Sequence, residues 1–234
     1  ARILNAVAGA VKPGVTTLEL DALARAQMQE AGVKPAFEGY QMAAAGPKYP
    51  AVLCSSVDHE VVHWIPRKDK ILREGQIIGL DLGIIHKGLY TDAAVSVAVG
   101  KTTPENEKLL RVTREALEAG IAQVKPGNRI GDIAHAIQSV AREAGFAVIR
   151  DLIGHGVGHA LHEKPDVPNY GRPGTLEKLA PGMVIAIEPM FTRGDWRIRF
   201  LDDGWTVVTA DGSPAAHFEH TVAVTETDAR VLTI

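Results

Sequence analysis

Cysteine is almost absent from this chain of 234 residues, since Cys54 is the only one. A lone cysteine excludes an internal disulfide and suits a reducing cytosol, so we expect a cytoplasmic protein. Long apolar runs are also missing, because the longest are strand-sized and broken by Asp, Glu or Gly. This pattern excludes a membrane-spanning helix. No signal peptide is visible, and the helical character of residues 1–11 predicts that an N-terminal piece precedes Ala1.

The chain has no large excess of charge of either sign. Its 25 basic and 28 acidic residues leave a formal net charge of −3, which gives no support for binding to nucleic acid or a membrane surface. Hydrophobic residues make up 46% and charged residues 23%, as in ordinary globular proteins. A chain of this length can bury one sizeable core, so residues 1–234 are expected to form a single domain.

Helices and strands can be placed from apolar periodicity and from Pro and Gly punctuation. Thr16 or Thr17 is expected to cap a helix that buries Leu18, Leu20, Leu23 and Met28. Two further helices are expected from Pro104 and over 130–144, and 165–174 reads as a loop. Strands are expected around 51–57, 184–188, 205–208 and 218–224.

The most informative stretch is 79–97, in which two apolar, β-branched runs flank Lys87-Gly88. This pattern predicts an antiparallel hairpin, and each arm carries one aspartate, Asp81 or Asp92. Two buried carboxylates on neighbouring strands repel each other, and neither arm contains Lys or Arg. A divalent cation between them would remove the repulsion. Aspartates solvated at the strand ends are the alternative, and the hairpin alone leaves both interpretations open.

A faint internal repeat relates the two halves of the chain. The segment 11–14 recurs as 124–127, both reading Val-Lys-Pro-Gly, and 72–81 resembles 179–188. The alignment pairs Asp81 with Glu188, and Asp92 with Glu219 in a similar match of 92–97 to 219–224. Two αβ halves related by a pseudo-twofold would bring these carboxylates to the seam between them.

The collected ionisable set suits a metal centre. Four carboxylates and one imidazole favour a pair of divalent ions such as Mn, Fe, Co or Zn, whose identity the sequence leaves open. Gly154, Gly156 and Gly158 are expected to let the backbone approach this crowded site. The expected ligands are Asp81, Asp92, His155, Glu188 and Glu219.

The order and spacing of these motifs resemble the type I methionine aminopeptidases. The motifs are Asp81 with Asp92 eleven residues on, Gly154-His155-Gly156-Val157-Gly158, Ile187-Glu188-Pro189-Met190 and Phe218-Glu219-His220-Thr221. The resemblance covers essentially the whole chain. It implies the α+β pita-bread (creatinase/aminopeptidase) fold, in which two αβ halves form a curved antiparallel sheet covered by helices.

The resemblance also implies residue roles. His155 and Glu188 would bind one ion and Asp81 the other, with Asp92 and Glu219 bridging both. Glu188 would be the proton shuttle, while His63 and His162 would contact the scissile amide without binding metal. Neutral imidazoles suit that role, because they can donate to a developing oxyanion. The residues expected to contact substrate are Tyr49, Cys54, His63, Leu161, His162 and Trp205.

Two of the departures from the family pattern concern the shape of the pocket. Trp64 occupies a position, beside His63, where the family usually has glycine, and the loop 40–49 is longer than usual. Tyr40 or another loop residue could therefore fill a pocket position. Trp64 adds bulk that would favour a small residue after the methionine, and the alternative is that it points into the core and leaves this preference untouched.

The expected function is removal of the initiator methionine from nascent proteins, with a small second residue preferred. The alternatives are an aminopeptidase P or prolidase, which would share the ligands, and a non-catalytic binding protein of the same fold, which would have lost some. Nascent N-termini are then the expected partners of a monomer. Docking on the ribosome stays open.

Overall fold

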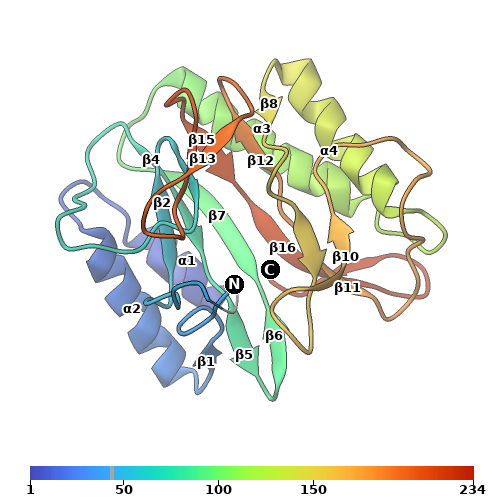
Figure 1. Ribbon diagram of the computed structural model, residues 1–234, viewed down its shortest axis with the longest axis horizontal. Coiled ribbons are helices and arrows are strands. Elements are labelled where there is room, and N and C mark those ends of the chain that lie inside the picture. Colours follow the sequence, from blue (N-terminus) through green and yellow to red (C-terminus); the bar gives the residue numbers. More distant parts are fainter. Residues whose placement is uncertain (43–44) are drawn as a thin grey trace.

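The computed structural model describes residues 1–42 and 45–234, and an eight-stranded sheet lies at its centre (Figure 1). Neighbouring strands run antiparallel in the order β10-β9-β11-β16-β7-β4-β2, with β17 beside β16. The strands are β2 (Cys54–Val57), β4 (Ile77–Asp81), β7 (Ala93–Ala98), β9 (Gly154–Gly156), β10 (Glu163–Val167), β11 (Val184–Ile187), β16 (Glu219–Val224) and β17 (Ala229–Val231).

Three small sheets surround the central one, in the orders β1-β5-β6, β15-β12-β8 and β13-β14-β3. Their strands are β1 (Lys34–Pro35), β3 (Glu60–Val62), β5 (Ile84–His86), β6 (Leu89–Thr91), β8 (Ala147–Val148), β12 (Met190–Thr192), β13 (Ile198–Phe200), β14 (Val207–Thr209) and β15 (Ala215–His217).

Each half of the central sheet has its own pair of helices. α1 (Arg2–Gly9) and α2 (Thr17–Glu30) pack with β2 and β4, whereas α3 (Pro104–Ile121) and α4 (Ile130–Ala144) pack with β11 and β16 (Figure 1). A capping box between Thr16 and Glu19 starts α2, and the left-handed Gly145 ends α4. No helix within the described residues is long and apolar enough to cross a bilayer.

The sheet order confirms the internal repeat. On one side of the central β7–β16 pair lie β4 and β2, and on the other lie β11 and β9. β4 pairs with β7 just as β11 pairs with β16, so the two halves are built alike. The repeated motifs therefore occupy equivalent places around one central seam.

Backbone geometry agrees residue by residue. Gly14 and Gly127, in the repeated Val-Lys-Pro-Gly motif, have φ of 91° and 95°, which glycine adopts without strain. Their amides donate to the carbonyls of Leu72 and Leu179, which the repeat also pairs. The similarity is thus structural and does not come from chance recurrence of Pro-Gly.

The predicted hairpin is confirmed, in two tiers. β4 pairs with β7 in the central sheet, and beyond them β5 pairs with β6 around Lys87-Gly88. Both turn residues have positive φ, 51° and 82°, as a two-residue hairpin turn of this type requires. Asp81 ends β4, and Asp92 lies between β6 and β7.

One helical residue was predicted on the wrong face. Leu18 is 44% exposed, because the buried face of α2 follows Thr17, Leu20, Asp21, Ala24 and Met28 at helical spacing. Asp21 can lie on this face because its Oδ1 accepts hydrogen bonds from the amides of residues 52 and 53.

The segment expected to be a loop from Pro165 begins inside a strand. β10 pairs with β9, and the register shifts between Glu163 and Asp166. Proline cannot donate to a strand ladder, but an irregularity at the edge of a sheet accommodates it. The prediction of a loop from Pro165 was therefore wrong for residues 165–167.

Candidate metal and peptide-binding site

One cavity brings together every residue that the sequence singled out for the site. Its walls come from both halves of the chain, as the repeat predicted. These residues are Tyr49, Cys54, His63, Asp81, Asp92, His155, Leu161, His162, Glu188, Trp205 and Glu219. Phe37, Tyr40, Met42, Val62, Leu152, Ile153 and Met190 complete the lining.

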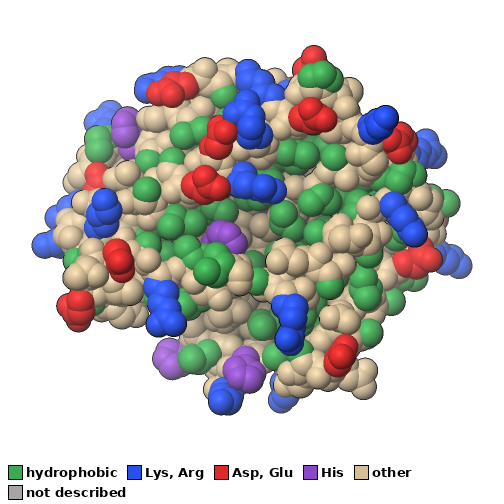
Figure 2. All heavy atoms as spheres, turned by 180° about the vertical axis from the view of Figure 1, so that it is seen from behind, with side chains coloured by type: hydrophobic (Ala, Val, Ile, Leu, Met, Phe, Trp, Pro, Cys, Tyr) green, Lys and Arg blue, Asp and Glu red, His purple; other side chains and the backbone are tan. Residues whose placement is uncertain are grey.

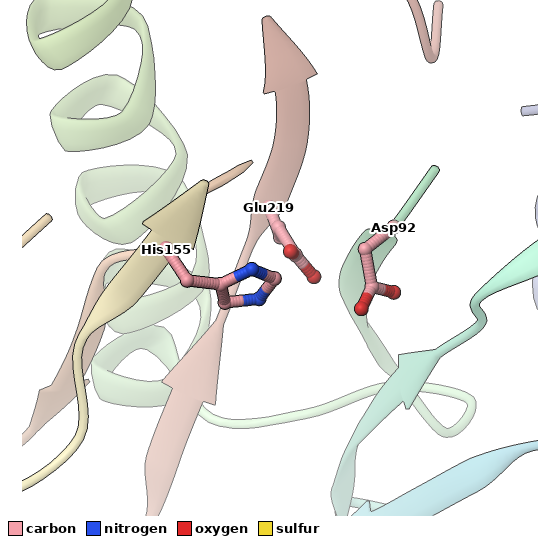
Figure 3. Close-up of side chains that lie close together, drawn as sticks. All are labelled: Asp92, His155 and Glu219. Atoms are coloured by element: carbon pink, nitrogen blue, oxygen red, sulfur yellow. The ribbon is translucent and has the colours of Figure 1, made fainter. Parts of the chain in front are cut away.

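The tightest ionisable group is Asp92, His155 and Glu219, which point toward one another from three separate segments (Figure 3). One ligand atom from each lies within 4.8 Å of the others, and all three side chains are buried. Pairing of β16 with β7 sets Glu219 opposite Ala94, and Asp92 is tied to β16 through the Thr221 hydroxyl. The sheet seam therefore places Asp92 beside Glu219, and β9 brings His155 to them.

Asp81 and Glu188 line the same cavity at equivalent places in the two halves. Asp81 ends β4 and Glu188 directly follows β11. Glu188 Oε1 lies 3.6 Å from His155 Nε2, and its Oε2 lies 3.5 Å from His217 Nε2. These contacts join Glu188 to the Asp92–His155–Glu219 group.

His217 was missed by the sequence analysis. Its side chain is buried, and its amide donates to the Ser96 hydroxyl, which in turn donates to the His217 carbonyl. The available signal was its position two residues before Glu219, because side chains at i and i+2 share a face of an extended chain. The His217 imidazole lies 3.5 Å from Glu188 Oε2, and His217 is not among the residues that line the cavity.

Without a cation, the charged forms of the four carboxyl groups are disfavoured by burial and by mutual repulsion. Burial and then the nearby Glu188 raise the pKa of Asp92 to about 7, and burial raises the pKa of Glu188 to about 7 against a smaller lowering by His155. Burial and neighbouring carboxylates raise the pKa values of both Asp81 and Glu219 well above those of ordinary carboxyl groups. No Lys or Arg lines the cavity among the residues that the structure describes.

The donors fit a divalent metal. Oδ1 of Asp81 and Oε1 of Glu219 are buried and have no hydrogen-bond partner within the described part of the chain. Unpaired buried oxygens are costly, and coordination to a cation would satisfy them. Buried carboxylates with one imidazole are a donor set for borderline divalent ions.

Glycine is required on both sides of His155. A Cβ at Gly154 would collide with the Ala186 carbonyl, and one at Gly156 with the Lys164 carbonyl. Close approach of β9 to its two neighbours is therefore confirmed for these positions. Gly158 meets only the distant end of the Glu163 side chain, so the prediction of crowding there was wrong.

Two cavity histidines are not joined to a carboxylate. Burial and then His217 lower the pKa of His63 to about 4, and burial followed by His155 and His63 lowers the pKa of His162. The His162 side chain is exposed at the cavity, so water moderates its shift, but both rings are neutral at pH 7. His63 also has a left-handed backbone with φ of 61°, which is strained for this residue and is typical of functional positions.

An apolar wall lies beside these histidines. Tyr49, Cys54, Leu161 and Trp205 belong to one buried cluster with Phe37 and neighbouring alanines. Tyr49 packs edge-to-face on Trp205 with ring centroids 5.1 Å apart, and its hydroxyl lies within hydrogen-bonding distance of the carbonyls of Leu53 and Trp64. The wall is buried and apolar, and it suits an unbranched, polarisable side chain.

Trp64 does not line this cavity, contrary to the expectation that it restricts the second residue. Lys70 Nζ lies 4.5 Å from the centre of its ring and 2.6 Å from the buried Glu60. Trp64 directly follows His63, whose backbone is left-handed, and only His63 of the two is among the residues that line the cavity. From the long loop 40–49, Tyr40 and Met42 do line the cavity, whereas residues 43–44 lie outside the described residues.

Removing metal is expected to destabilise the protein more at about pH 8 than at about pH 5. The pKa values of Asp92 and Glu188 near 7 lie above those of unfolded carboxyls, so the metal-free fold binds extra protons. That stabilisation is complete below about pH 4 and is lost as pH rises through 7. Metal requires the deprotonated carboxylates and replaces the lost protons.

The measurement is thermal unfolding with and without a chelator, at one fixed manganese concentration and several pH values. The midpoint difference isolates the metal ligands, because other titrating groups affect both samples. Each kcal/mol corresponds to about 2–4 °C for a domain of this size. A midpoint difference that stays constant from about pH 5 to about pH 8 would contradict this explanation.

Comparison with known proteins identifies the class. The model of metallopeptidase family M24 matches residues 1–226, and the chain belongs to that family. Prolidase from Pyrococcus furiosus shares the fold with a TM-score of 0.76, but at 22% identity and over only 60% of its own chain. The fold is the pita-bread fold expected from the sequence.

Within the family, the chain groups with the methionine aminopeptidases, as its motifs indicated. A methionine aminopeptidase of Clostridium acetobutylicum is 45% identical over 231 residues, covering 99% of this chain and 90% of the relative. The crystal structure of methionine aminopeptidase from Thermotoga maritima superposes with a TM-score of 0.95 at 48% identity, covering 99% of this chain and 91% of that one.

Proposed function

We propose that this chain is a metal-dependent aminopeptidase that removes the N-terminal methionine from new polypeptides. The observation that carries the proposal is a single cavity that holds both the carboxylate–histidine cluster and an apolar wall. The relatives named methionine aminopeptidase, which match along the whole chain, support it.

Asp81, Asp92, His155, Glu188 and Glu219 are proposed to hold two divalent ions of the Co, Mn, Fe or Zn type. Four carboxylates balance the charge of two such ions, and both halves of the repeat contribute equivalent donors. Divalent ions bound there would supply Lewis-acid activation of the scissile carbonyl and of water. Bridging by Asp92 and Glu219 agrees with their place at the seam.

The remaining chemistry belongs to the protein's own groups. Glu188 faces the cavity and contacts His155, so its carboxylate is placed to accept and return a proton during the reaction. Neutral His63 and His162 can donate to the scissile amide and to the developing oxyanion. Tyr49, Cys54, Leu161 and Trp205 would enclose the methionine side chain, whose flexible thioether follows such walls.

Residues 1–234 are proposed to act as one catalytic domain and as a monomer in the cytoplasm, where new N-termini emerge. The family match over nearly the whole chain supports a single domain. An Xaa-Pro peptidase is the second candidate, and it is less supported, because likeness to prolidases extends only to the fold.

A peptide panel tests the specificity. Met-Ala is expected to be cleaved fastest, and Leu-Ala or Ala-Ala about 10- to 200-fold more slowly, because a lost or misplaced methylene in an apolar pocket costs about 1–3 kcal/mol. Acetyl-Met-Ala should be inert, because a free terminal amine can ligate a metal ion and an acetylated amine cannot. Met-Leu should be slower than Met-Ala if a small second residue is preferred.

The Trp64→Gly variant is the control for the source of that preference. Since Trp64 lies under Lys70 and outside the cavity, the order of Met-Gly, Met-Ala, Met-Val and Met-Leu should stay unchanged in the variant. Faster cleavage of Ala-Pro than of Met-Ala by the native chain would favour the Xaa-Pro peptidase instead.

A further inference from the structure

Tyr40 is held in place where the long loop 40–49 begins and ends. Gly39 donates its amide to the Tyr49 carbonyl, and Tyr49 donates its amide to the Tyr40 carbonyl, both at 2.8 Å. The Tyr40 amide donates to Phe37. These bonds hold the backbone of Tyr40 independently of the middle of the loop, so its side chain has a defined position in the cavity wall.

The Tyr40 hydroxyl lies 2.7 Å from Nδ1 of His162, across 122 residues of sequence. Among the residues that the structure describes, Oη of Tyr40 has no other hydrogen-bond partner. Burial raises the pKa of Tyr40 above its usual 10, so the phenol keeps its hydrogen at neutral pH. The only described acceptor for that hydrogen is Nδ1 of His162.

A neutral imidazole carries one hydrogen, and the partner of one ring nitrogen decides which nitrogen bears it. If Nδ1 accepts from Tyr40, then Nε2 carries the hydrogen and is a donor. We propose that Tyr40 is a positioning residue that fixes His162 as the Nε2–H tautomer, with this N–H available to a substrate carbonyl in the cavity. The opposite tautomer would present a lone pair, which would repel a developing oxyanion.

The proposal rests on the proposed function for its catalytic consequence, but the tautomer itself can be observed without turnover. Protein labelled with 15N in its histidines and loaded with diamagnetic zinc would give the shifts of both His162 nitrogens, assigned with a His162→Gln variant. The native protein should show an unprotonated Nδ1 and a protonated Nε2. In Tyr40→Phe the two tautomers should exchange, moving both signals toward intermediate shifts.

Peptide kinetics provide the second measurement. Tyr40→Phe should lower kcat for Met-Ala about tenfold with little change in KM, because the variant keeps the ring in the wall and loses only the hydroxyl. Tyr90→Phe is the matched control, since Tyr90 packs against the same hydrophobic cluster without bonding to His162, and it should leave both kcat and the His162 signals unchanged.

A native His162 with its hydrogen on Nδ1 would overturn the proposal, and this spectrum decides even if Tyr40→Phe fails to fold. Loss of activity in Tyr40→Phe without a tautomer change would also overturn it, because Tyr40 would then be only part of the wall. If the native protein cleaves no Met peptide, the proposed function fails, whereas the spectrum still decides the tautomer.

Discussion

Replacing Asp92 by asparagine is expected to lower turnover of Met-Ala by about 10³-fold or more and to reduce the bound metal. Asp92 lies at the seam of the two halves, within 4.8 Å of ligand atoms of both His155 and Glu219. A carboxylate shared by two cations offsets their mutual repulsion, and an amide cannot. Lewis-acid activation is worth several kcal/mol, and each 1.4 kcal/mol is tenfold in rate.

Metal analysis and kinetics on the same preparation test this expectation. Asp202→Asn is the matched control, because Asp202 is exposed and outside the cavity, and it should retain both metal and activity. Normal turnover by Asp92→Asn with its metal retained would contradict the proposal that Asp92 bridges the two ions. If Asp92→Asn loses metal and the Asp202→Asn control does not, the Asp92 carboxylate contributes to metal affinity, as the donor geometry indicates.

Replacing His162 by alanine is expected to lower kcat by about 10²–10³-fold while the metal content stays normal. This is the range for loss of one donor to an oxyanion. His162 lines the cavity beside His155, with ring centroids 4.2 Å apart, yet it does not belong to the Asp92–His155–Glu219 group. Its neutral ring can donate without competing for the metal.

The distinction between donor and ligand comes from measuring metal affinity alongside kcat. His86→Ala is the control, since His86 is exposed next to the hairpin turn and should change neither quantity. If His162→Ala loses its metal instead, His162 is a ligand, and the assignment of His155 has to be revised. The Tyr40→Phe result then gains a different meaning, because Tyr40 would orient a ligand.

The local pattern of the chain was sufficient for much of the fold. Residues 130–144 form a helix as predicted, because apolar periodicity and the left-handed Gly145 mark its extent. The hairpin around Lys87-Gly88 followed from β-branched runs and turn chemistry. The predictions that Leu18 is buried and that a loop begins at Pro165 were wrong. Which face of a helix is buried, and whether a segment lies at a sheet edge, depend on the neighbours that pack against it.

The internal repeat alone paired Asp81 with Glu188 and Asp92 with Glu219, and the motifs singled out other residues that line the cavity. Only the tertiary structure decided what lies next to what. It placed His217 against Glu188, joined Tyr40 to His162 across 122 residues, and turned Trp64 away toward Lys70. The physical reason is that residue type and period are local properties, whereas a side chain's neighbours depend on the register of strands and the closure of loops distant in sequence.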